Sequence, residues 1–130
     1  MKIFLDANIL FSAANTHSAL YQTLCLLGEK HELATSYYAI GEARRNVALK
    51  KSDWLNCFEE LVTDLALCPQ GQLTETVKLV EKDRPILASA IAGKCAYLVT
   101  GDRKDFGHLY GQSLEGVLIL PPSDIAEKLL

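Results

Sequence analysis

The chain has 130 residues, of which 49% are hydrophobic and 22% charged, a composition that fits one globular domain spanning residues 1–130. With 13 Lys and Arg against 16 Asp and Glu, the net charge of −3 argues at face value against a broadly basic nucleic-acid binder. No apolar run reaches the roughly 18 residues of a membrane span, and Asp6 interrupts the first apolar run too early for a signal peptide. We therefore expect a cytoplasmic protein without a membrane segment.

Strands and helices alternate in the first half of the predicted structure. Short continuous apolar runs are typical of strands buried on both faces, and Ser residues are favourable helix caps. The predicted elements are a strand at Ile3–Leu5, a helix from Ser18 to Leu27 ended by Gly28, a strand at Glu32–Thr35, a helix from Tyr37 to about Lys50 capped by Ser36, a helix capped by Ser52 with its apolar stripe from Trp54 to Leu65, and a strand at Leu65–Cys68.

The second half continues the alternation. Its predicted elements are a helix from about Thr74 to Glu81, a helix capped by Asp83 with Pro85 in its first turn and Gly93 at its end, strands at Tyr97–Thr100 and Val117–Leu120, and a terminal helix capped by Ser123. This order predicts an α/β fold of three layers (α/β/α) with a central parallel sheet. Ligands of such folds bind at the edge where the strands have their carboxyl ends.

Acidic residues from distant parts of the chain are expected at that edge. Asp6 and Asp102 follow strands, Asp83 opens a helix, Glu42 lies one to two turns into a helix, and Asp105 follows Asp102 by three residues. Clustered carboxylates repel one another, and a divalent cation such as Mg²⁺ or Mn²⁺ removes the repulsion. Such a site can orient a water molecule and stabilise charge on a phosphodiester.

Each acid also has a simpler interpretation. Asp6 and Asp83 could serve only as caps of the segments that follow them. Glu42 could be a solvated helix residue, and Asp102 and Asp105 could be loop acids. The functional hypothesis gains weight because all of them fit one edge of one predicted sheet.

Four segments resemble the motifs of PIN-domain proteins, of the VapC type that acts as the toxin ribonuclease of VapBC toxin–antitoxin pairs. The resemblance covers nearly the whole chain, and the last segment is its most specific match. The segments are Leu5-Asp6-Ala7-Asn8-Ile9-Leu10, Tyr38-Ala39-Ile40-Gly41-Glu42-Ala43, Asp83-Arg84-Pro85-Ile86-Leu87-Ala88-Ser89-Ala90 and Leu98-Val99-Thr100-Gly101-Asp102-Arg103-Lys104-Asp105-Phe106.

The resemblance implies a Mg²⁺- or Mn²⁺-dependent ribonuclease that cleaves single-stranded RNA, with an antitoxin protein as partner and a homodimeric assembly. Carried over by position, the catalytic and metal-binding acids are Asp6, Glu42, Asp83 and Asp102, and the accessory residues are Asp105, Asn8 and Thr100. Two positions depart from the pattern. Pro85 is atypical so close to the third acid, and Ala7 stands where a Thr or Ser is often found.

Basic residues beside these acids are candidates for binding RNA phosphates. Arg45 follows Glu42 by three residues, and Arg103 and Lys104 lie between Asp102 and Asp105. Five of the 16 acids belong to the proposed cluster, so cations outnumber acids in the rest of the chain. The negative net charge therefore does not exclude RNA, and RNA binding is expected to depend on the metal.

Two other functions remain open at this stage. A phosphoacceptor receiver module also places acids and a Thr at strand ends around Mg²⁺, but receivers have two adjacent acids after the first strand, whereas Asp6-Ala7-Asn8 has one. A non-catalytic signalling or binding protein could keep the same fold without activity. The four cysteines contain no CxxC pair and are expected to be reduced thiols of the core.

Overall fold

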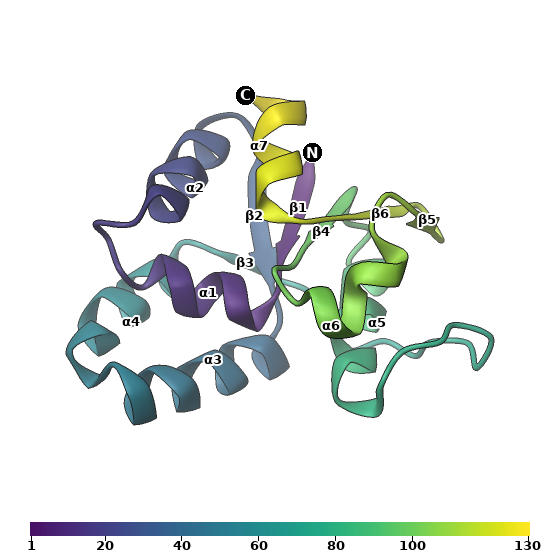
Figure 1. The fold of residues 1–130 in the computed structure, drawn as a ribbon, viewed down its shortest axis with the longest axis horizontal. Helices are drawn as coiled ribbons and strands as arrows, with labels where there is room; N and C mark the ends of the chain where they lie inside the picture. The colour runs from purple at the N-terminus through teal and green to yellow at the C-terminus, as the bar shows by residue number, and fades with distance from the viewer.

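A six-stranded sheet forms the centre of the computed structural model, which describes residues 1–130 (Figure 1). Its strands lie in the order β3-β2-β1-β4-β6-β5, and every neighbouring pair is parallel except β5 and β6. The strands are β1 (Lys2–Leu5), β2 (Glu32–Thr35), β3 (Ala66–Leu67), β4 (Tyr97–Val99), β5 (Ser113–Leu114) and β6 (Val117–Leu120).

Helices cover both sides of this sheet. In Figure 1, α1 to α4 lie to the left of the strands, and α5 and α6 lie to the right. The α-helices are α1 (Ala7–Ala13), α2 (Ala19–Lys30), α3 (Tyr37–Lys50), α4 (Leu55–Thr63), α5 (Arg84–Ala92), α6 (Arg103–Phe106) and α7 (Pro122–Leu129), and the 3-10 helices are η1 (Ser52–Trp54), η2 (Glu81–Asp83) and η3 (Gly107–Leu109). The predicted α/β architecture with a mainly parallel central sheet is confirmed.

The two central strands explain why the acids gather. The apolar runs of β1 and β4 are almost fully buried, because helices pack against both faces of the sheet. Leu5 pairs with Val99 in parallel register, so the residues that follow, Asp6 and Thr100, leave the sheet side by side. The Asp6 amide still donates to the Val99 carbonyl at 3.1 Å. Asp6 therefore begins α1 at a position fixed by the buried sheet.

The helix predicted from Thr74 to Glu81 is wrong. The segment has no regular structure before η2, and the Arg84 side chain binds its main-chain carbonyls instead. The guanidinium donates to the carbonyl oxygens of Leu73, Thr74 and Val77 at 3.2, 2.9 and 2.8 Å. These carbonyls are satisfied by a side chain, which an isolated amphipathic pattern could not reveal.

Several predicted helix ends differ from the structure. The helix α2 continues through Gly28 to Lys30, with Leu33 packed 3.5 Å from the position of a Cβ at Gly28. Ser52 begins η1 and caps nothing, so α4 starts only after it. Ser123 lies inside α7, because Pro122 occupies the first turn and Pro121 precedes it. The helices α1 and α6 and the short strand β5 are not among the predicted elements.

The cysteine prediction is correct only for part of the set. All four are free thiols, and Cys68 and Cys95 are buried with their Sγ atoms 3.6 Å apart. Cys25 is exposed and Cys57 is partly exposed, because both face outward from their helices. No helix has the length and apolar character that crossing a membrane requires.

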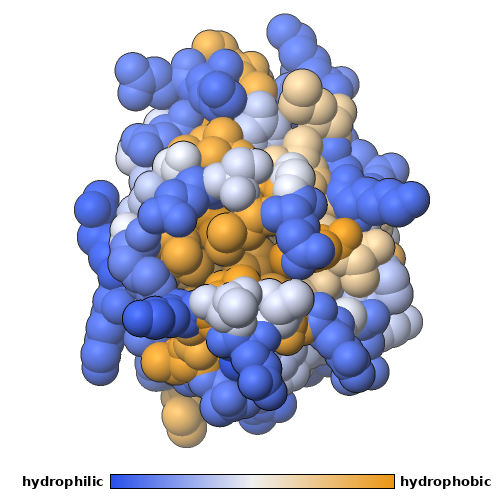
Figure 2. Space-filling model, turned by 90° about the vertical axis from the view of Figure 1, so that its right-hand side faces the viewer, coloured by the Kyte–Doolittle hydropathy of each residue, from blue (hydrophilic) through white to orange (hydrophobic).

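One face of the molecule carries an apolar area ringed by polar side chains (Figure 2). This face is the right-hand side of Figure 1, where β5 and the connection between β3 and η2 lie. Hydrophobic residues of these segments, including Leu73, Val77, Leu79 and Leu114, are only partly buried against the core. The connection between β3 and η2 is thus held by apolar packing as well as by Arg84.

Candidate functional site

Asp6 is the most deeply buried acid of the predicted set. Its residue is 2% exposed, and its Oδ1 accepts the Ala7 amide at 2.6 Å, so it caps α1. The second carboxylate oxygen, Oδ2, accepts the Thr100 hydroxyl at 2.7 Å and the Asn8 amide at 3.2 Å. Asp6 is therefore a helix cap, as its simpler interpretation predicts, and it also joins a polar network that connects β1 to β4.

Thr100 and Asn8 complete that network. The Asn8 side chain donates to Thr100 Oγ1 at 3.3 Å and accepts the Gly101 amide at 2.8 Å. The Asp102 amide donates to Thr100 Oγ1 at 3.2 Å, and the Tyr110 hydroxyl donates to the Thr100 carbonyl at 2.7 Å. These bonds fix the turn that carries Asp102 relative to Asp6. A preorganised polar network of this kind holds its carboxylates in one geometry.

Asp83 stands at the N-cap position of α5 but makes no capping hydrogen bond with its side chain. The residue is 4% exposed, and its Oδ2 is buried without a hydrogen-bond partner. An unpaired buried carboxylate oxygen is costly, and native structures rarely leave one. The cap interpretation of Asp83 is therefore wrong for its side chain, which points away from the helix end.

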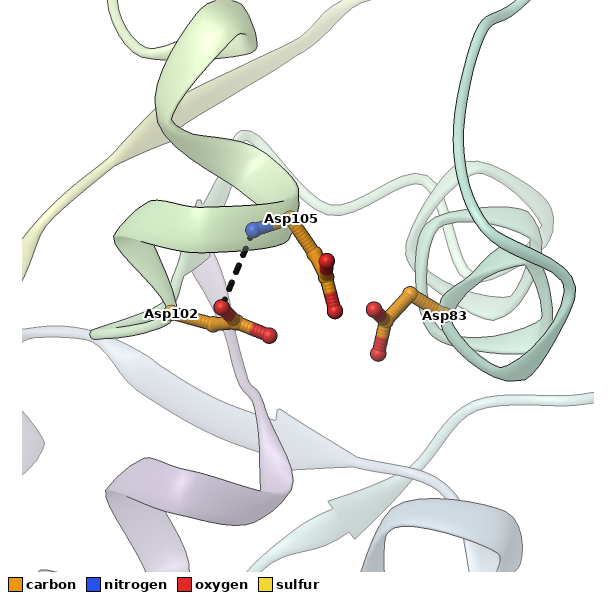
Figure 3. A group of neighbouring side chains, drawn as sticks. All are labelled: Asp83, Asp102 and Asp105. Atoms are coloured by element: carbon orange, nitrogen blue, oxygen red, sulfur yellow. Dashed lines mark hydrogen bonds between the residues drawn. The ribbon is translucent and has the colours of Figure 1, made fainter.

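Asp102 and Asp105 approach Asp83 from the other side of the cleft (Figure 3). One ligand atom from each of the three acids lies within 4.8 Å of the others. Asp102 caps the short α6 by accepting the Asp105 amide at 3.0 Å, which leaves its other oxygen free. Figure 3 shows the carboxyl groups of Asp83 and Asp105 directed toward each other, so three acids from two elements share one space.

All four principal acids line one open cleft of about 580 Å³. Its polar lining includes Ser12, Asn46 and Lys82 in addition to the predicted residues. The predicted residues in the lining are Asp6, Asn8, Glu42, Asp83 and Asp102. Glu42 projects from α3, and Asp105 lies beside the cleft, next to Asp83 and Asp102. Segments that are far apart in the chain thus meet at the carboxyl edge of the sheet.

The three predicted phosphate ligands lie outside this lining. Arg45 is exposed on α3, with its guanidinium 3.5 Å from the position of a Cβ at Gly41. Arg103 and Lys104 are exposed on α6. The basic residue that does line the cleft is Lys82, whose Nζ lies 3.5 Å from Asp105 Oδ2. Its position directly before Asp83 in the sequence is a signal that could have indicated it.

Burial changes the protonation of two acids. It raises the pKa of Asp6 to about 6, although the hydrogen bonds from Thr100 and Ala7 oppose the change. Burial, and then the interaction with the Asp105 carboxyl group, raise the pKa of Asp83 to about 7. The same interaction lowers the pKa of Asp105. Without a cation, Asp83 and Asp105 therefore titrate as an interacting pair.

The residues present fit a hard divalent cation. Mg²⁺ and Mn²⁺ favour carboxylate oxygens and need only a few protein ligands beside water. The unpaired Oδ2 of Asp83 and the free oxygen of Asp102 are donors of that kind. Asp83, Asp102 and Asp105 lie close enough together to share such an ion, and the carboxyl groups of Asp6 and Glu42 line the same cleft as Asp83 and Asp102.

Solved structures share this fold. A chain of VapBC2 from Rickettsia felis, crystallised with a fragment of its promoter DNA, superposes with a TM-score of 0.67 at 20% identity, over 93% of this chain and 98% of that one. A chain of VapBC-1 from nontypeable Haemophilus influenzae gives 0.61 at 13% identity, over 95% and 99%. The chain has the fold of these toxin–antitoxin structures.

A third structure agrees with the first two. A chain of FitAB bound to an IR36 DNA fragment superposes with a TM-score of 0.56 at 16% identity, over 92% of this chain and 94% of that one. No protein-family model and no curated protein sequence matches the chain. At these identities the superpositions show the fold alone, and the three-layer fold expected from the PIN-domain resemblance is confirmed at that level.

Proposed function

We propose that the chain is a Mg²⁺- or Mn²⁺-dependent endoribonuclease that cleaves single-stranded RNA. One observation carries the proposal: acids from four separate segments line one cleft, and a buried oxygen of Asp83 has no partner there. A bound divalent cation would supply charge stabilisation on the phosphodiester and a more acidic water. Because the chain is net acidic, the proposal also predicts that RNA binding depends on the bound metal.

The side chains of the cleft have different proposed roles. Asp6, Glu42, Asp83 and Asp102 are proposed as the catalytic acids that hold the cation. Thr100 and Asn8 keep Asp6 in place through their hydrogen bonds, and Asp105 supports Asp83. Because Asp6 and Asp83 have raised pKa values, their charged forms would be favoured beside a bound cation. A carboxylate at the cleft can then accept a proton from the attacking water.

Basic residues around the cleft are proposed to hold the RNA backbone. Arg45, Arg103 and Lys104 are exposed and none forms an ion pair with an acid of this chain. Free cations at the rim of an acidic site attract phosphates without selecting a base sequence. The exposed ring of Tyr37, on the first turn of α3, adds a surface on which a base could stack.

The fold neighbours support a toxin role. The matched chains come from the structures of VapBC2 bound to a promoter DNA fragment, of VapBC-1, and of FitAB bound to an IR36 DNA fragment. We propose by this likeness that the chain is the toxin of a toxin–antitoxin pair, bound by an antitoxin, acting as a homodimer in the cytoplasm. The test of the partner begins with the gene neighbourhood: if a small reading frame adjoins the gene, its product is co-expressed with this chain, and size-exclusion chromatography should show one complex that contains both proteins.

The direct test is cleavage of a single-stranded RNA with added Mn²⁺. We expect cleavage that EDTA stops and that Asp102→Asn abolishes, whereas Asp64→Asn, an exposed acid at the end of α4, leaves it intact. Cleavage that survives both EDTA and Asp102→Asn overturns the proposal. A chain that binds Mn²⁺ and does not cleave RNA would instead be the non-catalytic binding protein considered above.

A further inference from the structure

Lys82 lines the acidic cleft, whereas the three basic residues predicted to bind RNA do not. It belongs to η2, directly before Asp83, and it is the basic residue among those that line the acidic cleft. Its side chain is 65% exposed, and its Nζ lies 3.5 Å from Asp105 Oδ2. The ammonium group is therefore in contact with the acids and with solvent at the same time.

The backbone of Lys82 is fixed although its side chain is free to move. The Tyr38 hydroxyl, from the first turn of α3, donates to the Lys82 carbonyl at 2.6 Å. The next residue, Asp83, donates its amide to the Val80 carbonyl at 3.0 Å. These bonds anchor the base of a flexible four-carbon side chain at the rim of the cleft. The ammonium can swing between the carboxylates and the open side without a change of the main chain.

The charges around Lys82 determine which groups attract or repel its ammonium group. Asp83, and then Asp105, raise the pKa of the Lys82 ammonium, so it stays charged beside the cluster. In the protein without metal, the ammonium neutralises part of the negative charge of three acids within 4.8 Å of one another. A divalent cation among the same acids repels the ammonium, because like charges at such distances interact unfavourably. The Lys82 ammonium would then be an unpaired cation at the edge of the cleft.

We propose that Lys82 is an exchangeable counterion that pairs with Asp105 in the metal-free protein and with an RNA phosphate in the metal-bound protein. This inference rests on the proposed function and adds a substrate-contacting residue to it. It predicts that removing the charge of Lys82 has opposite effects on the two ligands. Metal binding becomes tighter because a competing cation is lost, and RNA binding becomes weaker because a phosphate contact is lost.

The experiment compares Lys82→Met and Lys82→Arg with Lys50→Met, a change of an exposed lysine at the far end of α3. Mn²⁺ affinity is measured by calorimetry without RNA, and kcat and KM are measured on a single-stranded RNA over a range of salt concentrations. We expect Lys82→Met to bind Mn²⁺ roughly 3- to 10-fold more tightly. We expect its KM to rise about 10-fold, and the salt slope of log(kcat/KM) to become smaller by about 0.7.

Each outcome decides between the inference and its alternatives. Lys82→Arg should keep values close to the wild type, because the charge is retained, and Lys50→Met should change neither quantity. If Lys82 has only a structural role, Lys82→Met weakens the binding of both Mn²⁺ and RNA, and that result overturns the inference. Unchanged Mn²⁺ affinity and unchanged KM in Lys82→Met overturn it as well. If the wild-type protein neither binds Mn²⁺ nor cleaves RNA, the proposed function itself fails.

Discussion

Two surface depressions of the molecule both contain acids, and the proposed metal site lies in the smaller one. A groove of about 1010 Å³ lies between α2 and α4, with Glu29, Glu60 and Asp64 among its lining residues. These acids are exposed, and they lie along solvated helix faces. The cleft of about 580 Å³ instead collects buried acids at the ends of parallel strands, where a cation is the natural partner. Burial and convergence of charge, rather than volume, distinguish a reactive site.

The strongest test of this difference between the groove and the cleft is to replace acids of each depression one at a time. Asp83→Asn and Asp102→Asn should each lower RNA cleavage by at least ~100-fold, because each removes a proposed metal ligand. Asp64→Asn, in the groove, should leave cleavage within about twofold of the wild type. Initial rates with saturating Mn²⁺ measure the difference. Equal loss of activity in Asp64→Asn and Asp83→Asn would show that the cleft has no special role.

A second test uses the cost of burying acids in the cleft. In EDTA, Asp83 keeps its proton up to about pH 7 in the folded protein but loses it near pH 3.8, its ordinary value, when unfolded. Between these pH values the folded state binds more protons, so the free energy of unfolding falls as the pH rises. Asp6, with a pKa of about 6, acts in the same direction over the lower part of this range.

Asp83→Asn should remove the Asp83 part of this pH dependence. Relative to the wild type, the variant should gain stability from pH 4 to pH 8 by at most ~4 kcal/mol, measured by urea unfolding with EDTA present. Asp64→Asn serves as the control for an exposed acid of the groove. Parallel pH profiles for the wild type and Asp83→Asn would mean that Asp83 is not protonated in the folded protein.

The hydrogen bond from Thr100 to Asp6 gives a third, smaller effect. Thr100→Val keeps the shape of the side chain but removes the 2.7 Å bond and leaves Asp6 Oδ2 with the weaker Asn8 donor. We expect a loss of about 1–3 kcal/mol of stability in urea unfolding and roughly 10-fold lower activity. Thr63→Val, whose hydroxyl donates to a carbonyl at an exposed helix end, should change stability by less than about 0.5 kcal/mol.

The smallest predicted effects concern two adjacent arginines, Arg44 and Arg45, which are expected to have different roles. Arg44 forms a bidentate pair with Glu59 at 2.8 Å on the exposed faces of α3 and α4, whereas Arg45 has no acidic partner. Arg44→Ala should cost about 0.5 kcal/mol of stability and leave cleavage unchanged. Arg45→Ala should lower kcat/KM roughly 3-fold through KM, because it removes a phosphate contact. The reverse pattern would exclude Arg45 from the RNA surface.

The sequence predicted the site better than it predicted the helices. Strand ends are marked by buried apolar runs, so the edge that gathers Asp6, Thr100 and Asp102 follows from local pattern and parallel topology. The false helix at 74–81 arose because the carbonyls of that segment bind Arg84, a partner that helical periodicity does not show. The position of Lys82 beside Asp105 was missed because the two residues belong to different elements, η2 and α6, and the sequence does not show that their side chains meet.

The N-cap residues Asp83 and Asp102 also show that a local sequence pattern does not predict where a side chain points. The sequence analysis suggests a helix cap at Asp83 and a loop acid at Asp102 as the simpler interpretations of these residues. In the structure Asp102 caps α6 and keeps one oxygen free, whereas Asp83 leaves its helix end uncapped and turns toward the other acids. Spacing along the chain did not separate the two cases, because the direction of a buried carboxylate depends on the charges around it.

The central claim is that the buried acids of the cleft hold a divalent cation. Calorimetric titration of the metal-free protein with Mn²⁺ tests it most directly, at pH 8, where the raised pKa values of Asp6 and Asp83 no longer oppose binding. We predict saturable binding in the wild type and in Asp64→Asn, and at least ~10-fold weaker binding in Asp83→Asn. Equal Mn²⁺ affinity in the wild type and Asp83→Asn, or no binding to the wild type, would contradict the account.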